Sequence, residues 1–206
     1  MSAPDNIDRF VRAIAAIDAA NAGDPETIVV AGVVRPKELA HAELATKWVR
    51  HFDPAADEAQ LLAARAHHLR RWTSPRSDFP DGRKGYLRWR AALKRMHGEL
   101  LAGILTEVGY DKVAIERARA IVEKRNLAAD PDVQTHEDAL CLVFLQTQFD
   151  SLDERIGDRD KLVDIVAKTM VKMSPRAIEA AVALEMSGSE RSVLTDAASL
   201  CARRET

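Results

Sequence analysis

Apolar residues recur along most of the chain at the three- and four-residue spacing of amphipathic helices. This spacing predicts helices over 5–22, 36–52, 57–72, 86–108, 111–125, 133–153, 160–172 and 174–185. Gly, Pro and Asp residues stand between several of these ranges, where they favour helix ends. Ser174 precedes Pro175, which suits a helix cap and a first helical position. The pattern therefore predicts an all-α protein.

Three stretches depart from the helical pattern. The short apolar run within 26–35 is too brief and isolated for a sheet, so we predict an extended loop. The segment 73–85 is rich in Pro, Asp, Ser and Gly, and loops of about a dozen residues are often functional. Low hydrophobicity predicts a loosely packed tail over 187–206. We expect a single-domain bundle of about seven to eight helices over 1–186.

The composition is that of a folded protein, with 47% hydrophobic and 30% charged residues. Cys141 and Cys201 are too few for a disulfide framework or a cysteine-based zinc site. No apolar run approaches the roughly 18 residues of a membrane span, and the first residues lack the pattern of a secretion signal. We therefore expect a cytoplasmic protein without membrane partners, and its oligomeric state stays open.

Positive charge is concentrated in one segment. Residues 65–95 hold ten Lys or Arg and two acids, a net charge of +8, so the rest of the chain carries −10. Eight of the ten are Arg, which suits bidentate contacts to phosphate or carboxylate oxygens. The segment is either a surface for an anion or a solvated helix and loop whose arginines pair with acids elsewhere.

Histidines and acids occupy inward positions on four predicted helices: Glu38, His68, His97 and Asp138. A carboxylate in an apolar helix is costly unless it is paired, hydrogen-bonded or metal-bound. Four helices that each offer one ligand can build a metal site within a bundle, and these donors suit Mn, Fe or Zn. The alternatives are core histidines, an ion pair of Asp138 with Arg65 or Arg71, and a helix-dipole role for Glu38.

The order of these residues resembles the HD superfamily of metal-dependent phosphohydrolases. The stretches 41–45, 61–68 and 137–138 follow that family's layout of a His, a later His-Asp pair and a final Asp. The resemblance implies an all-helical protein that holds one or two divalent metals. The paired dipeptide here is His67-His68 and has no Asp, and His97 is the candidate for the missing ligand.

A second resemblance covers nearly the whole chain. The segments 17–25, 63–72, 85–90, 94–97 and 134–138 are similar to the uncharacterised family known as domain of unknown function 4202. It implies a single-domain helical protein with no established activity. In that family the position of His41 is often aromatic and that of His67 is often Gln. The resemblance therefore favours Glu38, His68, His97, Glu137 and Asp138 as site residues.

Two hypotheses follow. In the first, the protein is a metal-dependent hydrolase of an anionic, phosphate-containing small molecule such as a nucleotide. Glu38, His68, His97 and Asp138 hold the metal, and Glu137 and Asp138 act in catalysis. The substrate is bound next to the 73–85 loop by Arg70, Arg71, Trp72, Arg88 and Arg90.

In the second hypothesis, the protein is a non-catalytic module that binds a nucleotide or nucleic acid. The arginines contact phosphates, and Trp72, Tyr86 and Trp89 stack on bases. The inward histidines and acids are then a structural polar network. Whether the protein is an enzyme stays open at this point.

Overall fold

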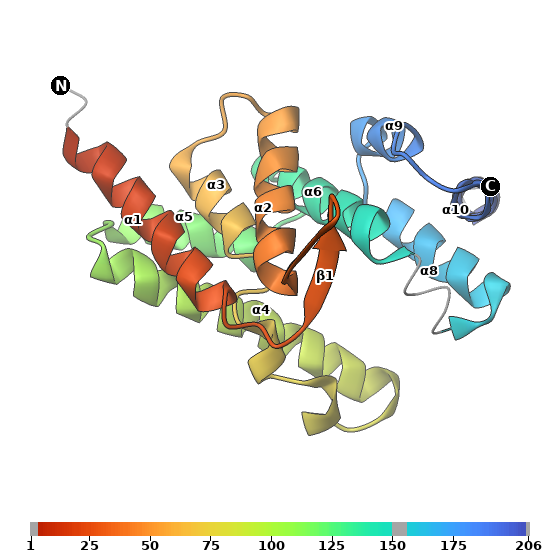
Figure 1. The fold of residues 1–206 in the computed structure, drawn as a ribbon, viewed down its shortest axis with the longest axis horizontal. Helices are drawn as coiled ribbons and strands as arrows, with labels where there is room; N and C mark the ends of the chain where they lie inside the picture. Colours follow the sequence, from red (N-terminus) through yellow and green to blue (C-terminus); the bar gives the residue numbers. More distant parts are fainter. Residues whose placement is uncertain (1–3, 150–155, 205–206) are drawn as a thin grey trace. The chain divides into compact units, whose positions relative to one another are not determined.

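The computed structural model of the protein describes residues 4–149 and 156–204. Most of these residues are helical, and the strands in this part of the chain form one two-stranded sheet. The chain divides into two compact units, one up to His136 and one from Glu137 onward (Figure 1). The division falls within helix α6 (Pro131–Thr147). The predicted all-α class is confirmed.

The first unit contains the hairpin and most of the helices. Its elements are α1 (Pro4–Asn21), β1 (Thr27–Val30), β2 (Val33–Pro36), α2 (Lys37–Phe52), α3 (Glu58–Arg65), η1 (Arg71–Thr73), η2 (Arg76–Asp78), α4 (Gly82–Glu107), α5 (Lys112–Val122) and the start of α6. The hydrophobic spacing predicts α1, α2 and α5 with nearly these ends.

The core of this unit lies where α1, α3, α4 and α5 pack together. Ile17, Leu62, Leu101, Leu105 and Ile121 are almost fully buried there. Burying a side chain of this size contributes about 1.5–3 kcal/mol. Each helix presents these residues at helical spacing, so the apolar pattern read from the sequence forms the core that positions the polar side chains described below.

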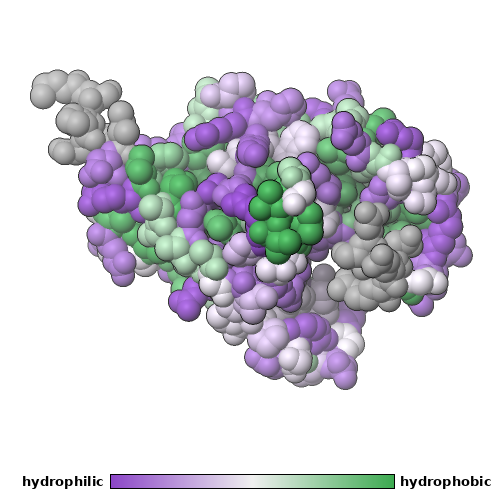
Figure 2. All heavy atoms as spheres, viewed as in Figure 1, coloured by the Kyte–Doolittle hydropathy of each residue, from purple (hydrophilic) through white to green (hydrophobic). Residues whose placement is uncertain are grey.

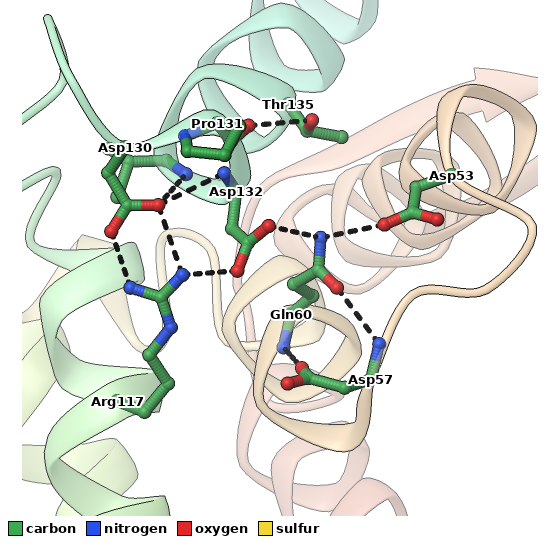
Figure 3. Close-up of polar contacts among 9 residues, drawn as sticks. Asp53, Asp57, Gln60, Arg117, Asp130, Pro131, Asp132 and Thr135 are labelled. Carbon is green, nitrogen blue, oxygen red and sulfur yellow. Dashed lines mark hydrogen bonds and ion pairs between the residues drawn. The ribbon is translucent and has the colours of Figure 1, made fainter.

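A polar network connects α3 and α5 with the start of α6 and with the residue that follows α2 (Figure 3). The side-chain amide of Gln60 in α3 donates to Asp53 after α2 and to Asp132 in α6, over 3.1 Å in each case. Asp132 also forms an ion pair with Arg117 of α5, which pairs with Asp130 as well. Because one side chain of α3 bridges to two neighbouring elements, the network fixes how α3 lies against them.

The segment predicted as an extended loop over 26–35 contains an antiparallel hairpin instead. Val30 pairs with Val33 across Ala31 and Gly32, which both have positive φ, 50° and 77°. Two-residue turns of this kind match the twist of paired strands. Three valines of the hairpin are more than half exposed: Val29, Val33 and Val34. Figure 2 shows the resulting hydrophobic patch over the hairpin.

The helix predicted over 57–72 ends early, at Arg65. The chain then turns through His68 and Arg70, whose φ values of 57° and 52° are left-handed and incompatible with a continuing helix. The helix α4 begins within the predicted loop. Gly85 lies very close to Pro80. A Cβ atom at position 85 would stand 1.7 Å from the carbonyl oxygen of Pro80, so a larger residue does not fit there.

The second unit continues α6 and adds α8 (Arg159–Met170), α9 (Pro175–Val182) and α10 (Gly188–Arg204). The structure differs here from the loose tail predicted over 187–206, because α10 packs on α8 and buries Val193, Leu194 and Ala197. These few apolar residues suffice for the packing, so the segment's mean hydropathy is low although α10 is packed. Residues 150–153 of the predicted helix over 133–153 lie outside the described residues. Within the described ranges, no helix is long and apolar enough to cross a membrane.

Candidate metal centre

A carboxylate and an imidazole lie together at the start of α2. Glu38 is in the first turn and is 3% exposed. Its backbone N–H donates to Asp24 Oδ2 over 2.9 Å, which ties this turn to the segment before β1. His41 follows three residues later, on the same helix face, and is 1% exposed. The spacing of Glu38 and His41 thus places both side chains in the interior.

A second imidazole reaches this pair from the turn after α3. His68 Nδ1 lies 3.1 Å from Glu38 Oε2, and His41 Nδ1 lies 3.4 Å from the same oxygen. Arg71 Nη1 lies 3.5 Å from the other oxygen, Oε1. The early end of α3 and the left-handed backbone of His68 thus bring a carboxylate, two imidazoles and a guanidinium together.

The surroundings keep Glu38 ionised and His68 neutral at pH 7. Burial alone would raise the pKa of Glu38, but His68 and His41 outweigh burial and hold that pKa well below its ordinary value. Burial lowers the pKa of His68 to about 4, although Glu38 opposes this shift. A carboxylate and neutral imidazoles are the protonation states that metal ions require.

Glu38, His41 and His68 fit a divalent metal ion. Each offers one ligand atom, and these atoms all lie within 4.8 Å of one another. Two ligands of a tetrahedral zinc ion, each about 2.0–2.1 Å from it, stand about 3.3–3.4 Å apart. The two separations between Glu38 Oε2 and the Nδ1 atoms, 3.1 and 3.4 Å, are close to that value. Three protein ligands would leave a position open for water or substrate.

His97 and His67 lie beside His68 but outside this group. The ring centroids of His68 and His97 are 5.8 Å apart, and those of His67 and His68 are 3.6 Å apart. Burial lowers the pKa of His97 to about 3 and holds that of His67 well below its ordinary value. His97 Nδ1 lies 3.0 Å from the backbone carbonyl of Leu69. Metal ligation by His97 stays a prediction.

Asp138 and Glu137 lie on α6 in the second unit, with partners of their own. The carboxylate of Asp138 is fully buried and accepts hydrogen bonds from Ser174 N over 2.8 Å and Ser174 Oγ over 2.6 Å. Arg176 Nε lies 3.7 Å from it. Glu137 Oε1 lies 4.0 Å from Lys172 Nζ. Asp138 therefore joins α6 to the start of α9 within the second unit, and its predicted role as a metal ligand stays a prediction.

The predicted substrate-binding residues are dispersed. Arg71 contacts Glu38, and its guanidinium lies 5.3 Å from the ring centroid of Trp89. Arg90 lines a small pocket together with His68 and His97. The other three are at the surface, with Trp72 half-buried and both Arg70 and Arg88 exposed.

Among the described residues, the positive segment 65–95 contains both paired and unpaired cations, so each of the two interpretations of its charge applies to part of it. Arg65 pairs with Asp18 over 2.5 Å, and Arg76 donates to the backbone carbonyls of Phe79 and Pro80. Several other cations of the segment form no ion pair with any described residue: Arg70, Arg83, Lys84, Arg88, Arg90 and Arg95. Most of these lie on α4, which therefore carries uncompensated positive charge.

Comparison with known families decides the chain's membership. A family model described as domain of unknown function (DUF4202) matches residues 11–194. The chain belongs to the DUF4202 family. No curated protein and no solved structure matches the chain. Membership of DUF4202 thus assigns no activity to the chain.

In this DUF4202 protein, sequence reasoning found Glu38 and His68 but gave too little weight to His41. The three-residue spacing from Glu38 was the available signal, and the family's frequent aromatic residue at that position pointed away from it. Lys94 and Lys124 also line the pocket beside His68 and were not singled out. No sequence spacing brings Lys124, which follows α5, to His68.

Proposed function

We propose that the protein is a metal-dependent hydrolase that acts on a phosphorylated or nucleotide-like substrate. The observation that carries this proposal is the buried Glu38–His41–His68 group, which is accompanied by Arg71 and by a pocket lined with cations. The resemblance of 41–45 and 61–68 to HD-type phosphohydrolases supports the reaction class. His68 stands where that family has Asp, so the ligand set would be richer in imidazole.

Glu38, His41 and His68 would hold the ion, and Mn, Fe and Zn suit these donors. Such an ion, when bound, supplies Lewis-acid chemistry and lowers the pKa of water toward about 7. Arg71 orients the Glu38 carboxylate through Oε1 and offers a positive charge to oxygens of the substrate. Glu137 and Asp138 are left out of the proposed site, because their carboxylates contact Lys172, Ser174 and Arg176.

Metal titration of chelator-treated protein tests the proposal. We expect one equivalent of Mn²⁺, Fe²⁺ or Zn²⁺ to bind, and the His41→Phe variant to bind at least about tenfold more weakly. His51→Phe is the matched control, because His51 is an exposed histidine on the same helix. Hydrolysis of p-nitrophenyl phosphate should need the ion and should be lost in His41→Phe. Absence of a stoichiometric ion, or equal affinity in the two variants, would overturn the proposal.

A second candidate function is the binding of nucleic acid by α4. It is favoured by the unpaired cations Arg83, Lys84 and Arg88, and by the exposure of Tyr86, whose ring is available for stacking. Binding to a single-stranded oligonucleotide should weaken steeply with salt, and Arg88→Gln should reduce the salt slope by about 1. Metal removal should leave this binding unchanged. An oligonucleotide that does not bind at low salt would exclude this function.

A further inference from the structure

A small pocket of about 30 Å³ adjoins His68. Four of its lining residues are buried and form the inner wall: His67, Leu93, His97 and Val122. Four are half-buried and form the opening: His68, Arg90, Lys94 and Lys124. A single water molecule needs a cavity of about 10–15 Å³. The pocket therefore accommodates a group as small as a phosphoryl group, and the remainder of a larger molecule must lie outside.

The charge at the opening selects an anion. Arg90, Lys94 and Lys124 bring three positive charges to it, and no acid lines the pocket. Arg90 forms no ion pair with any described residue, so its charge is not compensated by a carboxylate. The nearby Glu38 carboxylate is occupied by His68 Nδ1. Clefts lined by one sign of charge concentrate ligands of the opposite sign.

One residue of the inner wall, His97, carries a hydrogen-bond acceptor that no described residue uses. His97 Nδ1 lies 3.0 Å from the backbone carbonyl of Leu69, which can only accept a hydrogen bond, so Nδ1 carries the hydrogen. His97 Nε2 then presents a lone pair. This atom is buried and has no hydrogen-bond partner among the described residues. A buried acceptor without a donor is costly, so His97 Nε2 is suited to a ligand that brings a hydrogen.

The backbone at the opening is strained at two points. His68 and Lys124 both have left-handed φ values, 57° and 58°. The left-handed conformation is unfavourable for a residue with a Cβ atom. Strained residues cluster at ligand sites, where the surrounding structure maintains them. The fold thus holds one imidazole and one cation of the opening in an unfavourable conformation.

We propose that this pocket binds a terminal phosphoryl group in a form that carries a hydrogen, with Arg90, Lys94 and Lys124 around its oxygens and its O–H donating to His97 Nε2. The substrate class is therefore a phosphomonoester. A phosphodiester has no such hydrogen, and its two ester arms do not fit into a pocket of this size. The inference rests on the proposed function for turnover, but the binding itself needs no metal.

The proposal predicts discrimination between two anions of the same shape. Phosphate keeps a hydrogen at neutral pH, whereas sulfate has none to give to His97 Nε2. Removal of the acceptor should therefore abolish a preference for phosphate over sulfate. Removal of a cation at the opening should weaken the binding of both anions.

Calorimetric titration of the chelator-treated full chain tests this. We use inorganic phosphate, sulfate, phenyl phosphate and diphenyl phosphate at about pH 6.5, near the second pKa of a phosphomonoester. Phosphate and phenyl phosphate should bind, with sulfate at least about tenfold weaker and diphenyl phosphate not competing. Arg90→Gln should reduce the affinity for phosphate by at least about tenfold. Arg95→Gln, the same change at an exposed position of α4, should alter it less than about twofold.

The His97→Phe variant should bring the affinities for phosphate and sulfate close together. If this variant does not fold, the phosphate-to-sulfate ratio of the wild-type protein and the Arg90→Gln effect decide the question. Equal binding of phosphate and sulfate by the wild type, no saturable phosphate binding, or equal effects of Arg90→Gln and Arg95→Gln would overturn the inference. A chain that binds the metal but not phosphate refutes only the pocket. A chain that binds phosphate but no metal keeps the pocket and refutes the hydrolase.

Discussion

Glu38 in the first unit and Asp138 in the second are both buried carboxylates on helices, 3% and 0% exposed. The sequence predicts both as metal ligands, yet their partners differ. Two imidazoles share one oxygen of Glu38. Ser174 donates to both oxygens of Asp138, through its backbone N–H and its hydroxyl. An imidazole nitrogen can exchange its hydrogen for a metal ion, whereas a backbone N–H cannot.

The comparison shows that burial alone does not identify a functional acid. Both carboxylates must be satisfied, because an unpaired buried charge is strongly destabilising. The region of Glu38 satisfies this need with groups that are also metal ligands, and it has Arg71 within reach to balance charge. The region of Asp138 uses fixed donors at the start of a helix. We therefore expect opposite responses when the two carboxylates are changed.

Truncation of the structural carboxylate should have the largest effect. The Asp138→Ala variant removes the acceptor of the N–H and O–H of the half-buried Ser174, and we expect a loss of about 3 kcal/mol in the free energy of unfolding. Urea denaturation measures this. Glu185→Ala, an exposed acid of the same unit, should change stability by less than about 0.5 kcal/mol. An Asp138→Ala protein as stable as the wild type would show that this contact does not hold α9.

Removal of the charge at Glu38 should instead affect the metal. Glu38→Gln keeps the volume of the side chain but supplies a weaker ligand, and we expect metal affinity to fall about 100-fold, or about 2.8 kcal/mol. Competition with a chromophoric chelator measures this. Asp138→Asn is the counterpart, and its affinity for the ion should stay within about twofold of the wild type. A folded Asp138→Asn protein that loses the metal would make Asp138 a ligand and end the contrast between the two regions.

The sequence predicted the first region better than the second for a physical reason. Glu38, His41 and the apolar positions of α2 are three or four residues apart, so helical periodicity alone places them on one face. The position of His68 depends on an early helix end at Arg65 and a left-handed turn. The alternation of apolar and polar residues continued past Arg65 and predicted a helix up to 72. The inward direction of His68 was nevertheless predicted, from its helical spacing to the core residues Leu61 and Ala64.

The partner of Asp138 could not be predicted, because it depends on tertiary contact between α6 and the start of α9. Sequence reasoning recognised Ser174 as a helix cap, and Ser174 does occupy the N-cap position of α9. Its hydroxyl donates to Asp138 and makes no hydrogen bond to the backbone of its own helix. An isolated Asp on an apolar helix is compatible with a metal, an arginine or a hydroxyl, and only the fold distinguishes among them.

The pH dependence of stability should separate the two regions as well. Burial lowers the pKa of His97 from 6.5 to about 3, so below about pH 6.5 the unfolded chain binds a proton that the folded protein does not. Above about pH 6.5 the imidazole is neutral in both states, so His97 does not reduce the free energy of unfolding. As the pH falls from 6.5 toward 3, protonation of the unfolded chain reduces it progressively. One such imidazole should lower the free energy of unfolding by about 2 kcal/mol between pH 7 and pH 5. The second unit contains no histidine and should contribute nothing of this kind.

Urea denaturation of variants at pH 7 and pH 5 measures this contribution. His97→Gln should reduce the loss of stability by about 2 kcal/mol, and His51→Gln, at an exposed position, should leave it unchanged. His67 and His68 are also held neutral in the folded protein, so part of the loss should persist in His97→Gln. A His97→Gln protein that loses as much stability as the wild type would contradict the burial of a neutral imidazole at this position.

The smallest effect should come from the hydroxyl of Ser174. Ser174→Ala removes the hydrogen bond to Asp138 Oδ2 but keeps the backbone N–H on Oδ1, so the carboxylate stays partly satisfied. We expect a loss of about 1 kcal/mol in the free energy of unfolding, recovered in Ser174→Thr, and no change in metal affinity. A loss as large as that of Asp138→Ala would mean that the hydroxyl alone satisfies the carboxylate. The backbone N–H would then contribute little. The contrast with Glu38 would be weaker, because both carboxylates would depend on side-chain donors.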